Sequence, residues 1–136
     1  MNKKIWHWVI SIVIVIVVIV GGKLYMDHKA EQDYMVNVVK SDEAKKIFEK
    51  ELRYIDPQAL KQDGIIKNYK IDMGSVKHNP MGGIDVTLIL NKSSDITLQL
   101  NLNKDSGKLA SGVVIESQKL VSLDDKIHKN KVEANQ

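Results

Sequence analysis

An apolar run near the N-terminus, Ile5–Gly22, limits the fold of this chain more than any other feature. Between Val9 and Val20 only Ser11 is polar, and every other residue is Val or Ile. As a helix, this 18-residue run would be ~27 Å long, close to the thickness of a bilayer's hydrocarbon core. A helix that is apolar on all sides needs lipid or a much larger protein core around it. The run therefore predicts a transmembrane anchor, with the lipid bilayer as its partner.

Charged and aromatic residues at the two ends of the run indicate its orientation. Lys3 and Lys4 precede it, and the positive-inside bias places such residues in the cytoplasm. Two tryptophans at one end and Tyr25 at the other suit the headgroup layers, while Lys23 opposes the bias weakly. We expect a single pass through the cell membrane, with residues 1–4 as a cytoplasmic tail and the C-terminal domain extracellular.

A cleaved signal peptide is the alternative to an uncleaved signal-anchor. The small residues of Val20-Gly21-Gly22 offer a cleavage point, but the usual Ala-x-Ala pattern is missing. The apolar run is also longer than the core of a typical signal peptide. No Cys follows it, which excludes lipoprotein processing. We therefore favour the uncleaved anchor.

Composition narrows the classes of function for the remainder of the chain. The chain has 136 residues and a formal charge of +3, of which the two N-terminal lysines supply most. No basic stripe with interleaved aromatic residues appears, so we expect no nucleic-acid partner. The absence of Cys excludes disulfides, thiolate metal sites and a Cys nucleophile. An extracytoplasmic domain without disulfides fits a Gram-positive surface better than a eukaryotic one.

The segment after the anchor is predicted to be helical up to a proline. Residues 23–40 continue the span as a juxtamembrane helix or stalk. Ser41 can cap a second helix, and Asp56-Pro57 ends it because the residue before Pro avoids the helical region. One side of this second helix carries an apolar stripe, formed by Ala44, Ile47, Phe48, Leu52 and Ile55.

From Ile65 the apolar period changes from helical to two, which indicates strands. The predicted strands cover residues 65–71 with a short continuation at Val76, 84–90, 96–102 and 109–120. Gly107 lies in the turn between the last two and is placed for a positive φ. We expect an α+β fold in which the helix packs on an antiparallel meander of about four strands. The extracytoplasmic domain would span residues 41–120, and residues 121–136 would form a polar, frayed C-terminal tail.

The chain resembles a known family through three segments. They are Ser75-Val-Lys-His-Asn-Pro-Met-Gly-Gly-Ile84, Lys40–Lys46 and Asn103–Leu109. Together they are similar to short membrane-anchored proteins from listeriae, streptococci and relatives, a family catalogued as a domain of unknown function. The resemblance runs from the anchor to about Leu109 and implies an extracytoplasmic location. It brings no activity, cofactor or catalytic residue.

A weaker likeness concerns the fold alone. A helix followed by a meander looks like the cystatin-like and PepSY-type modules of bacterial surfaces, which bind or restrain other proteins. Such an analogy is associational, because one fold serves many functions.

The best candidate for a functional surface is a glycine-rich loop between two predicted strands. Asn79-Pro80 suits a turn, and Gly82-Gly83 allows conformations that side chains would prevent. Turn chemistry alone explains these residues, but the loop could also present His78 and Met81 to a partner. The candidate partner-binding residues are Ser75, Lys77, His78, Asn79, Pro80, Met81, Gly82 and Gly83.

No pattern for a metal, a cofactor or a catalytic group stands out. The four histidines are scattered without metal-ligand spacing, and no Gly-x-Ser-x-Gly elbow is present. Asn101, Asn103 and Asp105 alternate as in a calcium loop. That pattern requires Gly and an acidic residue where this chain has Ser106 and Gly112, so a hairpin turn is the better interpretation.

These observations favour a non-catalytic module that binds or modulates an envelope protein or an incoming peptide. Edge strands of the meander could pair with an extended peptide. One alternative is a surface hydrolase whose site gathers His78 with Asp72 or Asp85. Another is a structural subunit that assembles through its membrane span.

Overall fold

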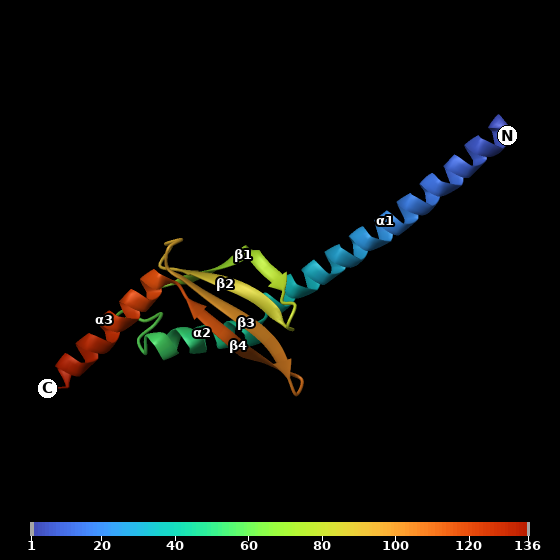
Figure 1. The fold of residues 1–136 in the computed structure, drawn as a ribbon. Coiled ribbons are helices and arrows are strands. Elements are labelled where there is room, and N and C mark those ends of the chain that lie inside the picture. Colours follow the sequence, from blue (N-terminus) through green and yellow to red (C-terminus); the bar gives the residue numbers. More distant parts are fainter. Residues whose placement is uncertain (1, 136) are drawn as a thin grey trace. The chain divides into compact units, whose positions relative to one another are not determined.

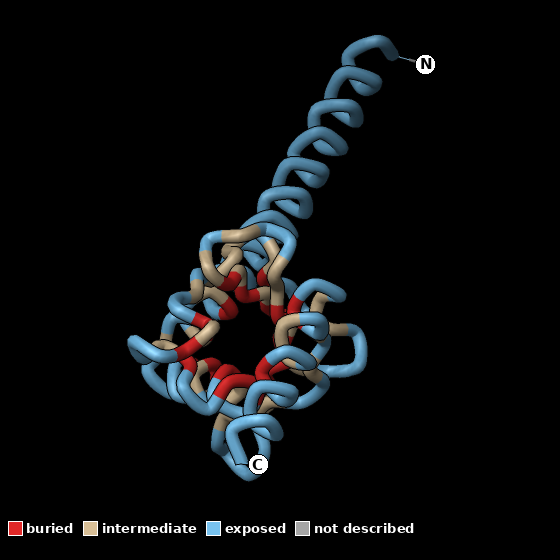
Figure 2. Tube along the Cα trace, turned by 90° about the vertical axis from the view of Figure 1, so that its left-hand side faces the viewer, coloured by how far each residue is buried: buried red, intermediate tan, exposed pale blue. Residues whose placement is uncertain are grey.

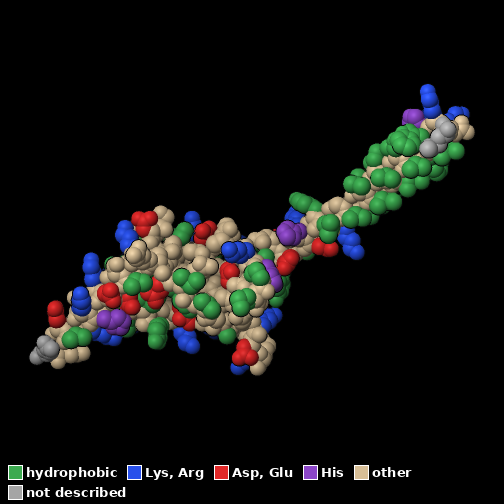
Figure 3. All heavy atoms as spheres, in the orientation of Figure 1, with side chains coloured by type: hydrophobic (Ala, Val, Ile, Leu, Met, Phe, Trp, Pro, Cys, Tyr) green, Lys and Arg blue, Asp and Glu red, His purple; other side chains and the backbone are tan. Residues whose placement is uncertain are grey.

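The computed structural model describes residues 2–135, and the chain divides into two compact units with the boundary after Tyr34. The first unit is most of helix α1 (Lys3–Val39), drawn in blue in Figure 1. This helix is long and apolar enough to cross a membrane, a property that anchors and signal sequences share. Hydrophobic side chains follow one another along its face in Figure 3. The segment predicted as a juxtamembrane helix continues α1 without a break as far as Val39.

The second unit starts with the last turns of α1, where Met35 and Val39 are buried in the core. A short turn leads to α2 (Asp42–Ile55). Ser41 caps this helix as predicted, since its Oγ accepts a hydrogen bond from the backbone N–H of Ala44 at 3.2 Å. The predicted apolar stripe is confirmed: Ala44, Phe48, Leu52 and Ile55 are buried, and Ile47 packs against them.

Four antiparallel strands form one sheet in the order β1-β2-β3-β4, which confirms the predicted meander (Figure 1). The strands are β1 (Tyr69–His78), β2 (Ile84–Leu90), β3 (Thr97–Asp105) and β4 (Lys108–Glu116). Turns join consecutive strands, and Gly107 in the last turn has a φ of +82°, as its position predicted.

The two faces of the sheet differ because successive side chains point to opposite sides. Val86, Leu88, Leu98 and Leu100 point to the inner face and are fully buried with α2. Figure 2 shows the buried residues gathered on the inner side of these elements. We call the opposite side of the sheet the outer face.

The connection between α2 and β1 is organised by a buried carboxylate. Asp56 is only 3% exposed. Its Oδ1 accepts a hydrogen bond from Gln58 N at 3.1 Å, and its Oδ2 accepts from Ile65 N at 2.7 Å and Ile66 N at 3.0 Å. These bonds hold the backbone of residues 57–66 against the end of the helix. The first strand consequently begins at Tyr69, later than the predicted start at Ile65.

The prediction for the C-terminal end was wrong. The final strand ends at Glu116 rather than Leu120, and helix α3 (Gln118–Ala134) takes the place of the predicted frayed tail. Leu120 and Ile127 of this helix are buried. Their spacing of seven residues puts both on one side of a helix, so the segment has an apolar stripe despite its polar composition.

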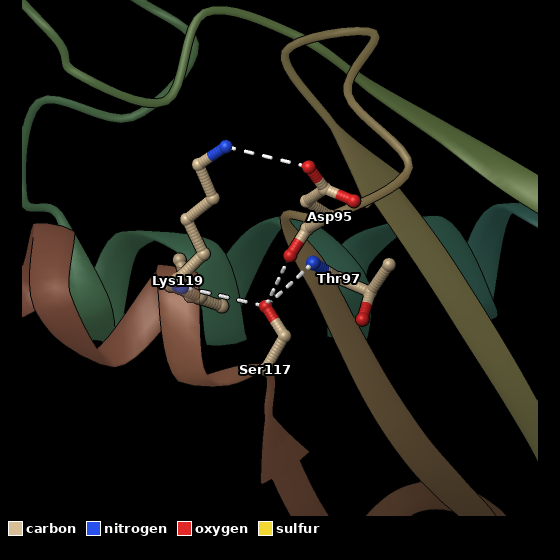
Figure 4. A network of polar contacts seen from close by, with 5 residues as sticks. Asp95, Thr97, Ser117 and Lys119 are labelled. Carbon is tan, nitrogen blue, oxygen red and sulfur yellow. Dashed lines mark hydrogen bonds and ion pairs between the residues drawn. The ribbon is translucent and has the colours of Figure 1, made fainter.

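Ser117 fixes the start of α3 to the sheet, as Figure 4 shows. Its Oγ accepts hydrogen bonds from Thr97 N at 3.0 Å and Leu120 N at 3.3 Å. The same hydroxyl donates to the carbonyl oxygen of Asp95 at 2.9 Å. One side chain therefore caps the helix and joins it to the start of β3. Lys119 adds an exposed ion pair with Asp95 at 3.4 Å.

Candidate functional site

The candidate loop connects β1 to β2 and is held in one conformation by its own hydrogen bonds. Asn79 N donates to the carbonyl oxygen of Gly83 at 3.0 Å, and Gly82 N donates to that of Asn79 at 2.9 Å. The side-chain oxygen of Asn79 accepts from Met81 N at 2.8 Å. The Met81 side chain itself is 98% exposed. We call residues 79–83 the displayed loop, because a rigid backbone presents an uncovered apolar side chain.

A group of polar side chains on the outer face supports this loop. Asn79 Nδ2 donates to both carboxylate oxygens of Asp85, at 2.9 and 3.0 Å. Asn101 Nδ2 donates to Asp85 Oδ1 at 2.9 Å and to the carbonyl oxygen of Gly82 at 3.2 Å. Asn103 Nδ2 extends the group by donating to Asn101 Oδ1 at 2.6 Å. We call Asn79, Asp85, Asn101 and Asn103 the Asp85 cluster.

Two members of the cluster are buried although it lies on the outer face, and the other two, Asn79 and Asn103, are half-buried. Asp85 is 9% exposed and Asn101 is 7% exposed. Buried polar groups are costly unless they are hydrogen-bonded, and these are bonded to one another and to the loop backbone. The arrangement therefore fixes the displayed loop from beneath.

Two glycines allow the backbone to approach the cluster closely. A Cβ on Gly83 would lie 2.1 Å from Asn103 Oδ1 and 2.5 Å from the carbonyl oxygen of Leu102. Gly83 also has a φ of +82°. A Cβ on Gly112 of β4 would lie 2.8 Å from Asn103 Nδ2. The predicted need for glycine at 83 is thus explained, and Gly112 serves the same cluster from the neighbouring strand.

The other predicted site residues lie on β1 and do not all share the loop's surface. Ser75 lies where the register of β1 against β2 shifts, and its Oγ donates to Asp72 O at 2.6 Å. That Oγ also accepts from Thr87 N at 2.8 Å, so Ser75 repairs the ladder at the bulge. Lys77 and His78 end the strand and are exposed beside the displayed loop.

The carboxylates considered for a hydrolase are engaged elsewhere. The hydrogen bonds of Asp85 go to Asn79 and Asn101, and Asp72 Oδ1 accepts from Gly74 N at 3.1 Å. Within residues 2–135 no group of three His, Cys, Asp or Glu side chains is arranged to hold a metal ion. The calcium-like spacing of Asn101 and Asn103 is explained by their bond to each other within the Asp85 cluster.

The sequence singled out the loop but missed its support. Asp85, Asn101 and Asn103 read as ordinary outward-facing polar residues of amphipathic strands. Their register brings them together, since Asp85 lies opposite Asn101 on β3. The one sequence signal was their position beside a glycine-rich loop, and it does not reveal that the residues are buried.

Comparison with known families identifies the family of the chain. The model of the family described as Protein of unknown function (DUF1310) matches residues 6–123. The chain belongs to this family. The DUF1310 match covers the apolar helix and the whole sheet and ends within α3, so most of that helix lies beyond it. No curated protein and no solved structure matches the chain. The predicted membership of a family of unknown function is confirmed, while the likeness to cystatin-like and PepSY-type modules stays a prediction.

Proposed function

We propose that this DUF1310 protein is a membrane-anchored binding module. The apolar part of α1 crosses the membrane with the N-terminus in the cytoplasm, and the α+β domain is displayed outside. The domain binds an envelope protein or an extracellular peptide through the displayed loop, without catalysing a reaction.

The exposure of Met81 on a fixed backbone carries this proposal. A side chain that is 98% exposed gains nothing from folding, whereas the surrounding backbone is ordered by four hydrogen bonds that involve Asn79, Gly82 and Asn101. A preorganised loop loses little conformational entropy when it binds, so more of its contact energy appears as affinity. Met is also an adaptable apolar side chain that suits a binding surface.

The neighbours of Met81 indicate the chemistry of its partner. Pro80 is exposed beside it, and Lys77 and His78 are exposed at the end of β1. This surface combines a small apolar tip with a positive charge and a hydrogen-bonding ring. Its complement is an apolar pocket with an acidic rim.

The proposed membrane anchor is tested by determining where the full chain is located in the cell. The full chain, expressed in cells, should stay in the membrane fraction after carbonate extraction. A protease added outside the cell should degrade the domain and leave the N-terminus intact. Release of the chain as a shorter soluble protein would show instead that α1 is a cleaved signal sequence.

The displayed loop is tested by crosslinking. A photo-reactive amino acid at position 81 of the membrane-bound full chain should give a specific adduct with one envelope component. Met81→Ala and His78→Ala, made separately, should reduce co-purification of that component several-fold at an unchanged Tm. Tyr54→Ala removes a side chain on α2 that is 86% exposed and serves as the matched control. Unchanged co-purification in both loop variants would show that the loop is only structural.

A further inference from the structure

The two edges of the sheet are not equally protected against pairing with another strand. The β1 edge is interrupted where the register shifts between Asp72 and Lys77. Bulges and lysines are the usual means by which proteins prevent an edge strand from pairing. Lys70 and Lys77 are both exposed on this strand. The β1 edge is therefore poorly suited to accept a partner.

The first half of β4 is covered by side chains from α2. Glu43 Oε1 accepts a hydrogen bond from Leu109 N at 2.7 Å. Glu51 Oε1 accepts from Ser111 Oγ at 2.6 Å. These two glutamates occupy the edge of residues 108–111, so a new strand could not pair there without displacing them.

The second half of β4 has an open and apolar edge. Val113 and Ile115 are 68% and 55% exposed. Within residues 2–135 no strand pairs with β4 on the side away from β3. Ser117 N donates to Thr97 O at 2.9 Å, so the backbone groups of Ser117 point towards β3. Because these groups alternate in direction along an antiparallel strand, the backbone N–H and C=O of Ile115 also point towards β3. The backbone N–H and C=O of Val114 and Glu116 then point outward.

We propose that residues 113–116 pair in antiparallel fashion with the same segment of a second copy of this chain. The two-fold axis passes midway between Val114 and its copy, so the outward N–H of each bonds to the outward C=O of the other. Val113 then lies opposite Ile115 of the second copy in a non-hydrogen-bonded pair, where side chains are closest. This register covers both exposed apolar side chains of each copy. It also places Glu116 opposite a glycine, so no like charges face each other.

The small size of the surface favours a second copy over a freely diffusing partner. Four residues of strand bury far less than the ~800 Å² per partner that stable interfaces need. Such a contact forms only at a high effective concentration, which confinement of both copies to one membrane provides. The inference therefore rests on the anchor proposed above, but it does not depend on the displayed loop.

The absence of cysteine makes this contact directly testable. Full-length Val113→Cys and Ile115→Cys chains are reconstituted together in phosphatidylcholine vesicles and oxidised mildly. A directly opposed, non-hydrogen-bonded pair has a Cα separation that suits a disulfide. We expect a dimer yield at least several-fold above that of Tyr54→Cys, which reports random collision on an exposed helix position. A yield equal to this control would overturn the proposal.

A second variant separates edge pairing from other contacts. Adding Glu116→Pro to both chains removes an outward N–H without touching the ladder to β3. Pairing predicts a clear fall in dimer yield at an unchanged Tm, and an unchanged yield would overturn the strand geometry. In native membranes, a crosslink from position 113 to a different protein would overturn the second copy as the occupant.

Vesicle flotation distinguishes failure of the proposed dimer from failure of the proposed membrane anchor. Chains that do not float with the vesicles would overturn both the anchor and the dimer. Chains that float without crosslinking would overturn the dimer alone.

Discussion

Two buried carboxylates, those of Asp56 and Asp85, both accept hydrogen bonds, but they lie in different regions and hold different parts of the chain. Each accepts three hydrogen bonds. Those of Asp56 come from the backbone N–H groups of Gln58, Ile65 and Ile66. Those of Asp85 come from the side-chain amides of two asparagines.

The difference lies in what each carboxylate holds. The backbone N–H of Ile66 is buried and has no access to water in the folded chain, so we expect Asp56 to be required for the path from α2 into the sheet. The partners of Asp85 are side chains, and the half-buried Asn79 can turn to water if the carboxylate is removed. We therefore expect Asp56 to stabilise the fold as a whole and Asp85 to stabilise mainly the displayed loop.

The largest effect is expected for Asp56→Ala. Three backbone N–H groups, of which that of Ile66 is buried, would lose their acceptor, which should cost about 3 kcal/mol of unfolding free energy. Urea unfolding measures this loss. Asp63→Ala, at an exposed position of the same connection, is the control and should change stability little. Equal stability of the two variants would remove the contrast between the carboxylates.

A matched pair of glycines tests how tightly the loop is packed on its support. Gly82 and Gly83 both have positive φ, but a Cβ meets nothing within 4 Å at Gly82 and lies 2.1 Å from Asn103 Oδ1 at Gly83. Gly83→Ala should therefore be less stable than Gly82→Ala by about 2 kcal/mol. Thermal unfolding of the two variants makes the comparison. Equal losses would mean that only backbone conformation matters at position 83.

Asp85→Ala should act locally rather than globally. We expect a loss of about 1–2 kcal/mol, together with faster hydrogen exchange at Met81 N and Gly82 N, which the loop protects. Exchange in β3 should stay close to that of the original chain. The control is Asp105→Ala, which removes an exposed carboxylate at the last residue of β3. Uniformly faster exchange through the sheet would show that Asp85 is as essential to the fold as Asp56.

The smallest effect is expected at a third carboxyl, that of Glu116, which lies near another carboxylate. Burial, and then the nearby Asp124 carboxylate, raises the pKa of Glu116 above its ordinary value of 4.5. A raised pKa means that the folded state favours the protonated form. Glu116 therefore lowers stability as pH rises from the ordinary value through the raised one.

Glu116→Gln should remove this pH dependence. The gain at neutral pH should stay below about 0.5 kcal/mol, because the group is partly exposed and solvent screens it. The test is to measure the free energy of unfolding of both chains from about pH 4, near the ordinary carboxyl pKa, to about pH 7. A variant that is less stable than the original at neutral pH would contradict the assigned cause.

Local sequence patterns were sufficient to predict much of the secondary structure of the second unit. The capping serine at 41, the apolar stripe of α2 and the alternation in β2 and β3 each depend on neighbours a few residues away. Gly107 is at its predicted positive φ for the same reason. The helix α3 was not predicted because its apolar stripe is short: Leu120 and Ile127 are buried, but the residues around them are mostly polar.

The candidate site shows which features local sequence patterns cannot predict. The sequence marked the Asn79–Gly83 turn because Pro and Gly restrict or free the backbone wherever they occur. It did not mark Asp85, Asn101 or Gly112, since nothing in their own segments distinguishes them from solvent-facing strand residues. Only pairing of the strands puts them within hydrogen-bonding distance.

The sequence by itself therefore determined the apolar N-terminal helix, the α+β class and the order of the strands. Periodicity and chain-breaking residues encode all three, and these act over short distances. The tertiary structure alone decided which polar side chains are buried, which loop they hold, and which half of one edge strand stays open. Those properties depend on contacts between residues far apart in the chain, such as Glu43 with Leu109, and no single segment records them.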